Sequence, residues 1–282
     1  MGNESSLIAG QPIDQIDRIY IEPTNRCNLD CRTCMRQEWD TEPGMMSRDL
    51  FAKIVKDTRH LPAAPTFFFG GYGEPLSHPD IVWMVKQAKS LQARVELITN
   101  GILLSEDLAR QLIEAGLDFI WVSLDGATPE SYADVRLGAA LPQVLDNLSR
   151  FYRYRILNHL QSPDLGISFV AMKRNIADLP DVIELGRKIG AVKFSVSNVE
   201  AYSEAMQDEV LYAKSLVDQR CRLHIAMPRL DGDDKIAEVI QKLIMAHGWS
   251  GPLGSDFVDP ADICPFVQRG STSVRWDGGV SP

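Results

Sequence analysis

Three of the chain's five cysteines, Cys27, Cys31 and Cys34, lie within eight residues in the spacing C-x3-C-x2-C. Cysteine thiolates are the protein ligands of iron–sulfur clusters, so three of them on one short loop can hold three corners of a cluster. A closed structural site would use a fourth protein ligand, whereas three ligands leave one metal corner open for a small molecule. The spacing therefore predicts an iron–sulfur cluster with one open corner.

Two alternatives to a cluster are a zinc knuckle and three unrelated thiols. Structural zinc asks for a fourth Cys or His at similarly short range. His60 and His78 are the nearest candidates, and neither has a ligand-like spacing from the cysteines. Ligand count and spacing therefore favour the iron–sulfur interpretation.

The elements around the cysteine loop alternate between strand and helix patterns. The loop directly follows a predicted strand over 16–22, at the end of the strand where α/β folds bind ligands. Ser47 and Ser105 are predicted to cap helices. The predicted strands are 16–22, 66–69, 94–99, 119–124, 166–172 and 193–196, and the predicted helices are 47–59, 80–90, 105–115, 129–135, 141–156 and 178–189. Six such units predict a parallel sheet in a partial, open (β/α)6 TIM-like barrel.

The pattern weakens after residue 199. We expect an amphipathic helix over 201–219, a strand over 222–227, a helix over 234–246, an extended loop over 248–260 and a hairpin near the end, turning at 277–279. The predicted division is a lead-in over 1–15, the barrel over 16–220, and a linker with the start of a further module over 221–282.

Composition excludes several classes of protein. The 282 residues carry a net charge of -9, which argues against a broad nucleic-acid footprint, and 45% are hydrophobic, as in a globular protein. No apolar run is long enough to span a membrane, and residues 1–15 show no secretory signal. Unevenly clustered cysteines fit the reducing cytoplasm better than a disulfide framework.

Three motifs in this order resemble the radical SAM superfamily: the cysteine loop, the glycine-rich turn 70–75 that ends in Gly-Glu-Pro, and Ser-x-Asp-Gly at 123–126. The resemblance covers about residues 16–199. It implies a [4Fe-4S] cluster on Cys27, Cys31 and Cys34, with S-adenosylmethionine on the open iron. It also implies an external electron donor like ferredoxin or flavodoxin, and a 5′-deoxyadenosyl radical that abstracts hydrogen from a substrate.

The resemblance assigns cofactor contacts to residues at the strand ends. Glycines let main-chain groups approach the methionine end of the cofactor, and an acidic side chain suits its ammonium. The expected S-adenosylmethionine contacts are Gly70, Gly71, Gly73, Glu74, Thr99, Asn100, Ser123, Asp125, Arg136, Val170 and Met172.

Several of these residues could have a structural role instead of a contact with the cofactor. The turn 70–75 could be an ordinary βα turn, and Ser123 and Asp125, expected at the ribose hydroxyls or the carboxylate, could be caps. Arg136 is expected at the cofactor carboxylate, with a solvated helix charge as its alternative. Residues 170–172 are expected to form an apolar wall for adenine.

One residue departs from the family pattern. Thr33 stands where many members carry an aromatic residue next to the third cysteine, so the adenine contact must differ, and Tyr72 is a candidate replacement.

The tail, Cys264 and residues 274–282, resembles the opening of a SPASM or twitch extension, which binds auxiliary iron–sulfur clusters. We expect the chain to end inside that module, which leaves Cys264 without its partner cysteines; alternatively, Cys264 is a small buried hydrophobe. The runs 31–36, 69–75 and 169–176 also resemble maturases of tungsten-cofactor oxidoreductases.

These resemblances predict a radical SAM enzyme that matures or modifies a peptide, a protein or a metal cofactor. The alternatives are a non-enzymatic iron–sulfur or zinc scaffold or sensor, and radical chemistry on a small metabolite. No motif identifies a catalytic base or the substrate. We expect no membrane partner and disfavour nucleic acid.

Overall fold

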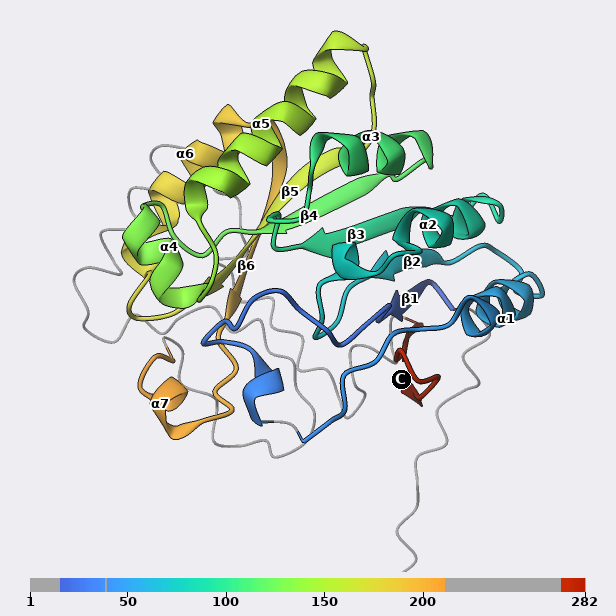
Figure 1. The fold of residues 1–282 in the computed structure, drawn as a ribbon, viewed down its shortest axis with the longest axis horizontal. Coiled ribbons are helices and arrows are strands. Elements are labelled where there is room, and N and C mark those ends of the chain that lie inside the picture. Colours follow the sequence, from blue (N-terminus) through green and yellow to red (C-terminus); the bar gives the residue numbers. More distant parts are fainter. Residues whose placement is uncertain (1–15, 39, 211–269, 282) are drawn as a thin grey trace, which may run out of the picture.

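The computed structural model describes residues 16–38, 40–210 and 270–281. These residues form one sheet whose strands lie in the order β6-β5-β4-β3-β2-β1-β7-β8 (Figure 1). The strands are β1 Arg18–Ile21, β2 Thr66–Phe69, β3 Val95–Thr99, β4 Phe119–Ser123, β5 Asp164–Ala171, β6 Ala191–Asn198, β7 Ser271–Val274 and β8 Val280–Ser281.

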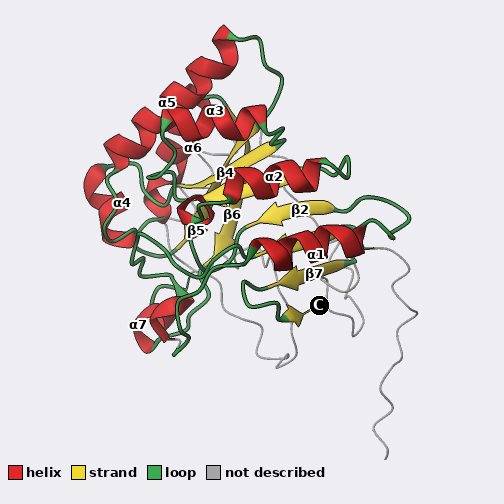
Figure 2. Ribbon diagram, turned by 45° about the vertical axis from the view of Figure 1, so that its right-hand side comes forward, coloured by secondary structure: helices red, strands yellow, loops and turns green. Residues whose placement is uncertain are grey.

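The first six strands pair in parallel with their neighbours in the chain. Right-handed crossovers between strands that follow in order place the connecting helices on the same face of the sheet. Figure 2 shows α1, α2, α3 and α5 along that face. The α-helices are α1 Arg48–Thr58, α2 Ile81–Lys89, α3 Glu106–Glu114, α4 Pro129–Val135, α5 Leu141–Leu157, α6 Leu179–Lys188 and α7 Glu204–Gln207.

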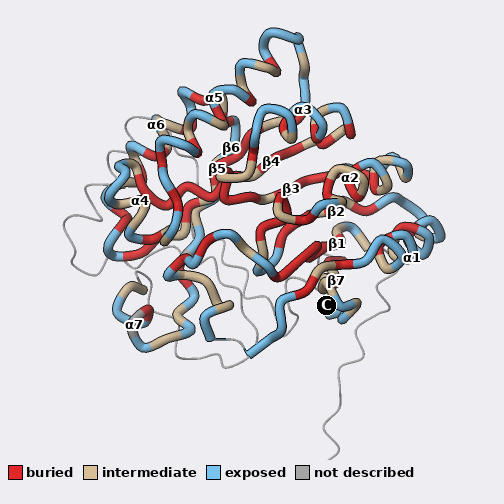
Figure 3. The backbone as a smooth tube through the Cα atoms, in the orientation of Figure 1, coloured by how far each residue is buried: buried red, intermediate tan, exposed pale blue. Residues whose placement is uncertain are grey.

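The main core lies between the helices and the sheet, where Figure 3 shows mostly buried strands and helices exposed on their outer sides. The Phe51 ring of α1 packs 6.3 Å from the Phe67 ring and 5.7 Å from the Phe69 ring of β2, centroid to centroid. All three rings are fully buried. Burial of a side chain of this size contributes about 1.5–3 kcal/mol. This packing holds β2, and with it the glycine-rich turn, against the helix that follows the cysteine loop.

The predicted fold class is confirmed in the parallel sheet of six strands with crossing helices. The two predicted caps are also present: the Ser47 side chain accepts a hydrogen bond from the N–H of Leu50, and Ser105 accepts one from Leu108. No described helix is long and apolar enough to cross a membrane.

The tail hairpin is confirmed as the antiparallel pair β7–β8. The sequence did not indicate its partner: β7 lies parallel to β1, with Val274 beside Ile21. The cysteine loop therefore follows a strand that has a neighbour on each side. The division into a lead-in, a barrel and a further module stays a prediction.

The predicted helix over 201–219 is wrong in its described part, because only α7 is helical there and residues 208–210 leave the helix. The physical reason is a tertiary contact: the Glu209 carboxylate accepts hydrogen bonds from the main-chain N–H and the Nε of Arg174. The remainder of that helix, the predicted elements over 222–260 and Cys264 lie outside the described residues.

Candidate functional site

The cysteine loop runs along the end of α4. The main-chain N–H of Asp30 donates to the carbonyl of Leu137 at 3.1 Å, and that of Arg32 donates to the carbonyl of Val135 at 3.0 Å. The N–H of Cys34 closes a turn onto the carbonyl of Cys31 at 3.1 Å. The segment that follows β1 is therefore held against the segment that follows β4.

Two of the three thiols receive an N–H group, one from the end of β3 and one from the end of α4. Asn100 Nδ2 lies 3.9 Å from Cys27 Sγ, and Arg136 Nη1 lies 3.9 Å from Cys31 Sγ. Burial raises the pKa of both thiols, and the charge of Arg136 opposes the rise at Cys31. Cys31 is buried, whereas Cys27 and Cys34 are half-buried.

Within the described residues, no group of three or more His, Cys, Asp or Glu side chains is placed to hold one metal ion. A structural zinc site needs its donors around one ion, whereas the cysteines of a cluster each bind a different iron. The choice between a cluster and zinc therefore stays a prediction.

The glycine-rich turn after β2 packs on the cysteine loop. A Cβ on Gly73 would lie 2.1 Å from the carbonyl oxygen of Thr24 and 2.6 Å from that of Arg26. Gly71 has a φ of +127°, which disfavours any other residue, and a Cβ on Gly70 would lie 2.8 Å from the Ile98 side chain. Each missing side chain thus faces protein atoms, and the approach of these main-chain groups to a cofactor stays a prediction.

Glu74 joins the turn to the end of β3. Its carboxylate accepts hydrogen bonds from Leu76 N at 2.9 Å, Thr99 Oγ1 at 2.7 Å and Asn100 N at 2.8 Å. Burial raises its pKa, since only 2% of the residue is exposed. Glu74 makes no salt bridge in the described part of the chain. Its carboxylate is therefore held by neutral donors, and its predicted contact with an ammonium stays a prediction.

Asn100 extends this connection to the cysteine loop. Its Nδ2 donates to Asn28 Oδ1 at 2.9 Å, and its Oδ1 accepts from the N–H of Ile102 at 3.0 Å. Both ends of the amide are thus oriented, and the N–H that reaches Cys27 is fixed. The end of β3, where Thr99 and Asn100 were predicted to line the site, does lie against the cysteine loop.

Asp125 and Arg136 form a buried ion pair beside Cys31. Asp125 Oδ2 accepts from Arg136 Nε at 2.6 Å and Nη2 at 2.5 Å, and Oδ1 accepts from the N–H of Val170 at 2.7 Å. Burial lowers the pKa of Arg136, but the charges of Asp125 and Cys31 outweigh it and the pKa is raised overall. Arg136 is therefore a permanent cation in the interior, and the alternative of a solvated helix charge is wrong. Its predicted contact with a cofactor carboxylate stays a prediction.

Two other predicted residues lie at the same edge of the sheet with different surroundings. Ser123 ends β4 and is buried. Met172 is fully buried in a small cluster with Val135, Val199 and Met206, against which Val170 packs. The Met172 side chain presents no open surface here, so the expected adenine wall rests on the half-buried Val170.

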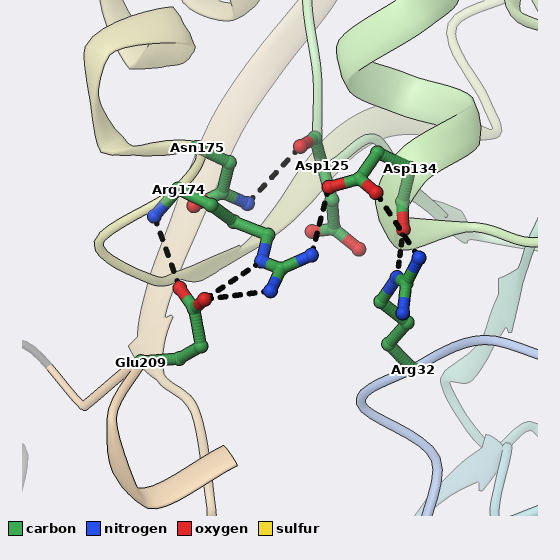
Figure 4. Close-up of polar contacts among 6 residues, drawn as sticks. All are labelled: Arg32, Asp125, Asp134, Arg174, Asn175 and Glu209. Atoms are coloured by element: carbon green, nitrogen blue, oxygen red, sulfur yellow. Dashed lines mark hydrogen bonds and ion pairs between the residues drawn. The ribbon is translucent and has the colours of Figure 1, made fainter. Parts of the chain in front are cut away.

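A chain of charged residues around the site was not predicted (Figure 4). Arg32, inside the cysteine loop, pairs with Asp134 of α4 at 3.2 Å, and Asp134 pairs with Arg174 at 2.8 Å. Arg174 also pairs with Glu209 at 2.7 Å. These partners are 35 to 102 residues apart in the chain. No pattern in a single sequence links them, although Arg32 stood within the motif.

Glu22 is a second residue that was missed. It is 6% exposed, and its Oε1 accepts from the N–H of Tyr72 at 3.1 Å, whereas its Oε2 has no hydrogen-bond partner of good geometry among the described residues. Burial raises its pKa, and the N–H groups of Tyr72 and Trp276 and the charge of Arg275 oppose the rise. An acidic residue at the end of the predicted strand 16–22, shortly before the cysteine loop, was the available signal. Tyr72 itself is 36% exposed, and its predicted adenine contact stays a prediction.

Comparison with known proteins identifies the family of this chain. A sequence profile described as the Radical SAM superfamily matches residues 21–185. The chain is 29% identical over 267 residues to the tungsten-containing aldehyde ferredoxin oxidoreductase cofactor-modifying protein of Pyrococcus furiosus, across 94% of this chain and 70% of that protein. This confirms the predicted likeness to tungsten-cofactor oxidoreductase maturases.

Other relatives are matched over a smaller share of their length. The probable GTP 3′,8-cyclase of Methanococcus maripaludis is 33% identical over 63% of this chain and 57% of its own. The PqqA peptide cyclase of Rhodopseudomonas palustris is 27% identical over 79% of this chain and 58% of its own. The chain thus spans little more than half the length of these two relatives.

Solved structures share the fold at low sequence identity. Streptococcus suis SuiB bound to S-adenosylmethionine has a TM-score of 0.66 at 14% identity, over 95% of this chain and 60% of that chain. The structure of anSMEcpe with bound AdoMet has a TM-score of 0.56 at 19% identity, over 69% of this chain and 55% of that chain.

Proposed function

The chain belongs to the Radical SAM superfamily. We propose that it is a radical SAM enzyme, because the GTP cyclase and the peptide cyclase named above are enzymes. The proposed ligands of its [4Fe-4S] cluster are Cys27, Cys31 and Cys34. When bound, the cluster and S-adenosylmethionine supply reductive cleavage to a 5′-deoxyadenosyl radical, with an external donor like ferredoxin or flavodoxin as the electron source.

The observation that carries this proposal is the meeting of three motifs at one edge of the sheet. Asn100 from the end of β3 and Arg136 from the end of α4 each direct an N–H group at a different cysteine of the loop after β1. Thiols with N–H donors suit a cluster, whose sulfur ligands are commonly hydrogen-bonded. The residues present therefore fit the group that the superfamily implies.

We propose that the chain's own groups at this edge bind S-adenosylmethionine. Glu74, with no salt bridge in the described residues, would attract the ammonium, and the half-buried Val170 would contact the adenine. The remaining proposed contacts are Gly70, Gly71 and Gly73 after β2, Thr99 and Asn100 at the end of β3, Ser123 and Asp125 at the end of β4, and Arg136 after α4. Glu74 also joins the end of β2 to the end of β3, and Asp125 joins the end of β4 to β5, which would orient the cofactor.

We propose maturation or modification of a peptide, a protein or a metal cofactor as the biological task. Similarity to the cofactor-modifying protein supports a metal cofactor as the substrate, and similarity to the peptide cyclase supports a peptide as the substrate. An auxiliary cluster that involves Cys264 in a SPASM or twitch extension is part of the same proposal. The proposed compartment is the reducing cytoplasm, where thiols stay free for iron.

The competing function is a non-enzymatic iron–sulfur or zinc scaffold or sensor. A scaffold would bind metal but not S-adenosylmethionine, so calorimetry of the reconstituted chain with S-adenosylmethionine separates the two. The glycine-rich turn that ends in Gly-Glu-Pro favours the enzyme, because a structural metal site has no need of that loop.

The test of the proposal is anaerobic reconstitution with iron and sulfide, followed by incubation with S-adenosylmethionine and dithionite. We expect the charge-transfer absorbance of a [4Fe-4S] cluster and formation of 5′-deoxyadenosine, both lost when any one of Cys27, Cys31 and Cys34 is replaced by alanine. A loaded chain that forms no 5′-deoxyadenosine would contradict the enzyme, and a cluster that survives the alanine substitutions would contradict the ligand set.

A further inference from the structure

The guanidinium of Arg136 is held between a carboxylate and a predicted cluster ligand. Its Nε and Nη2 donate to Asp125 Oδ2 at 2.6 and 2.5 Å, and its Nη1 lies 3.9 Å from Cys31 Sγ. Only 12% of the Arg136 side chain is exposed, and none of Asp125 is. The positive charge that faces the sulfur is therefore largely shielded from solvent.

Asp125 is itself fixed, so the guanidinium has a defined direction. The N–H of Val170 donates to Asp125 Oδ1 at 2.7 Å, and Asn175 Nδ2 donates to the main-chain carbonyl of Asp125 at 3.0 Å (Figure 4). Asn175 in turn donates to the carbonyl of Val170 at 2.9 Å. The ends of β4 and β5 thus orient the group that points at Cys31.

The donors to the three cysteines are unequal. Cys31 faces a charged guanidinium, and Cys27 faces the neutral amide of Asn100 at 3.9 Å. No side-chain donor to Cys34 Sγ is found among the residues that the structure describes. A charged donor interacts more strongly than a neutral one, and low local polarity strengthens both.

N–H donors to the cysteine sulfurs change the reduction potential of a cluster. When an oxidised cluster accepts one electron from an external donor, its negative charge increases by one. A nearby cation or N–H group stabilises the more negative, reduced form and so raises the reduction potential. The effect of Arg136 should exceed that of Asn100, because Arg136 is a cation with Nη1 directed at Cys31, although the Asp125 carboxylate offsets part of its charge.

We propose that Arg136 sets the reduction potential of the cluster through Cys31, with Asn100 in a smaller role at Cys27. This rests on the proposed function, because it requires a cluster on the cysteine loop. It goes beyond that function, since it gives Arg136 a role at the cluster before S-adenosylmethionine binds. Arg136 acts through Cys31 and is therefore a positioning residue rather than a catalytic one.

The experiment measures the midpoint potential of the full-length chain, reconstituted anaerobically and titrated without S-adenosylmethionine. The variants are Arg136→Gln, Arg136→Lys and Asn100→Ala. Arg110→Gln is the matched control, because Arg110 pairs with Asp107 on the exposed surface of α3. Iron and sulfide content and the absorbance spectrum establish equal loading in every sample.

We expect Arg136→Gln to shift the potential to more negative values, Arg136→Lys and Asn100→Ala to shift it less, and Arg110→Gln to leave it unchanged. An equally loaded Arg136→Gln variant with the wild-type potential would overturn the proposal. If that variant does not fold or load, the double variant Asp125→Asn/Arg136→Gln decides. It removes both buried charges together, so a wild-type potential there overturns the proposal equally. Failure of the wild-type chain to form a cluster would instead contradict the proposed function.

Discussion

At the scale of single residues, Asp125 connects three parts of the fold. Its own position follows β4, its Oδ1 accepts from the N–H of Val170 in β5, and its Oδ2 pairs with Arg136 after α4. A buried charge that loses its partner is costly, because no water replaces the lost contact. The pair should therefore matter to stability even in the chain without cofactors.

We predict that Asp125→Asn lowers the free energy of unfolding by about 3–5 kcal/mol, because it leaves the buried Arg136 without a counter-charge. Urea denaturation of the cofactor-free chain measures the change. Asp107→Asn, in an exposed pair with Arg110, is the control and should cost less than about 1 kcal/mol. Equal losses in the two variants would contradict the assigned importance of burial.

A second prediction concerns the pH dependence of stability at Glu22. Burial raises its pKa above the ordinary value of 4.5, so the folded chain holds this proton more tightly than the unfolded chain. The resulting stability is fully present below about pH 4.5 and is lost as pH rises through the raised pKa. Glu22→Gln keeps an acceptor for Tyr72 but cannot ionise.

The difference in unfolding free energy, wild type minus Glu22→Gln, should therefore fall as pH rises above the ordinary glutamate range and then level off. Urea titrations of both chains at a series of pH values measure it. A difference that stays constant, or that grows with pH, would show that the pKa of Glu22 is not raised in the folded state.

At this scale, the sequence singles out residues that share a local motif. Cys31 and Asp125 belong to short patterns, and the parallel strands brought those patterns together. The pairs Arg32–Asp134 and Arg174–Glu209 were missed because their members are distant in the chain and each is an unremarkable surface charge by itself. Only the fold makes them neighbours.

At the scale of elements, the glycine-rich turn and the cysteine loop are packed main chain against main chain. Gly73 lacks room for a Cβ because the carbonyls of Thr24 and Arg26 occupy that space, and the N–H of Glu74 donates to the carbonyl of Arg26 at 2.8 Å. The loop that carries the cysteines therefore takes part of its position from the turn after β2.

We predict that Gly73→Ala displaces the cysteine loop, lowers the free energy of unfolding by about 1–3 kcal/mol and reduces the iron bound on reconstitution. Gly279→Ala is the control, because the nearest atom to its Cβ would be the flexible Asp277 side chain at 3.2 Å. Denaturation and iron analysis of both variants test this. Wild-type iron content in Gly73→Ala would mean that the turn does not position the loop.

Elements were predictable where local signals agreed. The predicted helix 129–135 has the same bounds as α4, and the Ser47 cap begins α1 as expected. The turn residues of the β7–β8 hairpin indicated that hairpin. They did not indicate that β7 pairs with β1, because pairing between strands far apart in the chain leaves no local pattern. The helix expected over 201–219 failed because the bonds between Glu209 and Arg174 override an amphipathic pattern.

At the scale of the whole molecule, the sheet gathers the predicted site at one edge. Strands that run in parallel end together, so the loops after β1 to β5 meet although their residues span more than half of the chain. The chain spans 70% of its cofactor-modifying relative and 57–58% of the cyclases named above. The whole protein's substrate is accordingly proposed from their names and not from a site in this fold.

The central claim is that three cysteines leave one iron of the cluster open for S-adenosylmethionine. Electron paramagnetic resonance of the reduced, reconstituted chain with and without S-adenosylmethionine tests it most directly, because a ligand on that iron changes the electronic environment of the cluster. We predict a spectrum that shifts on addition of S-adenosylmethionine. A [4Fe-4S] signal that is identical with and without saturating S-adenosylmethionine would contradict the account.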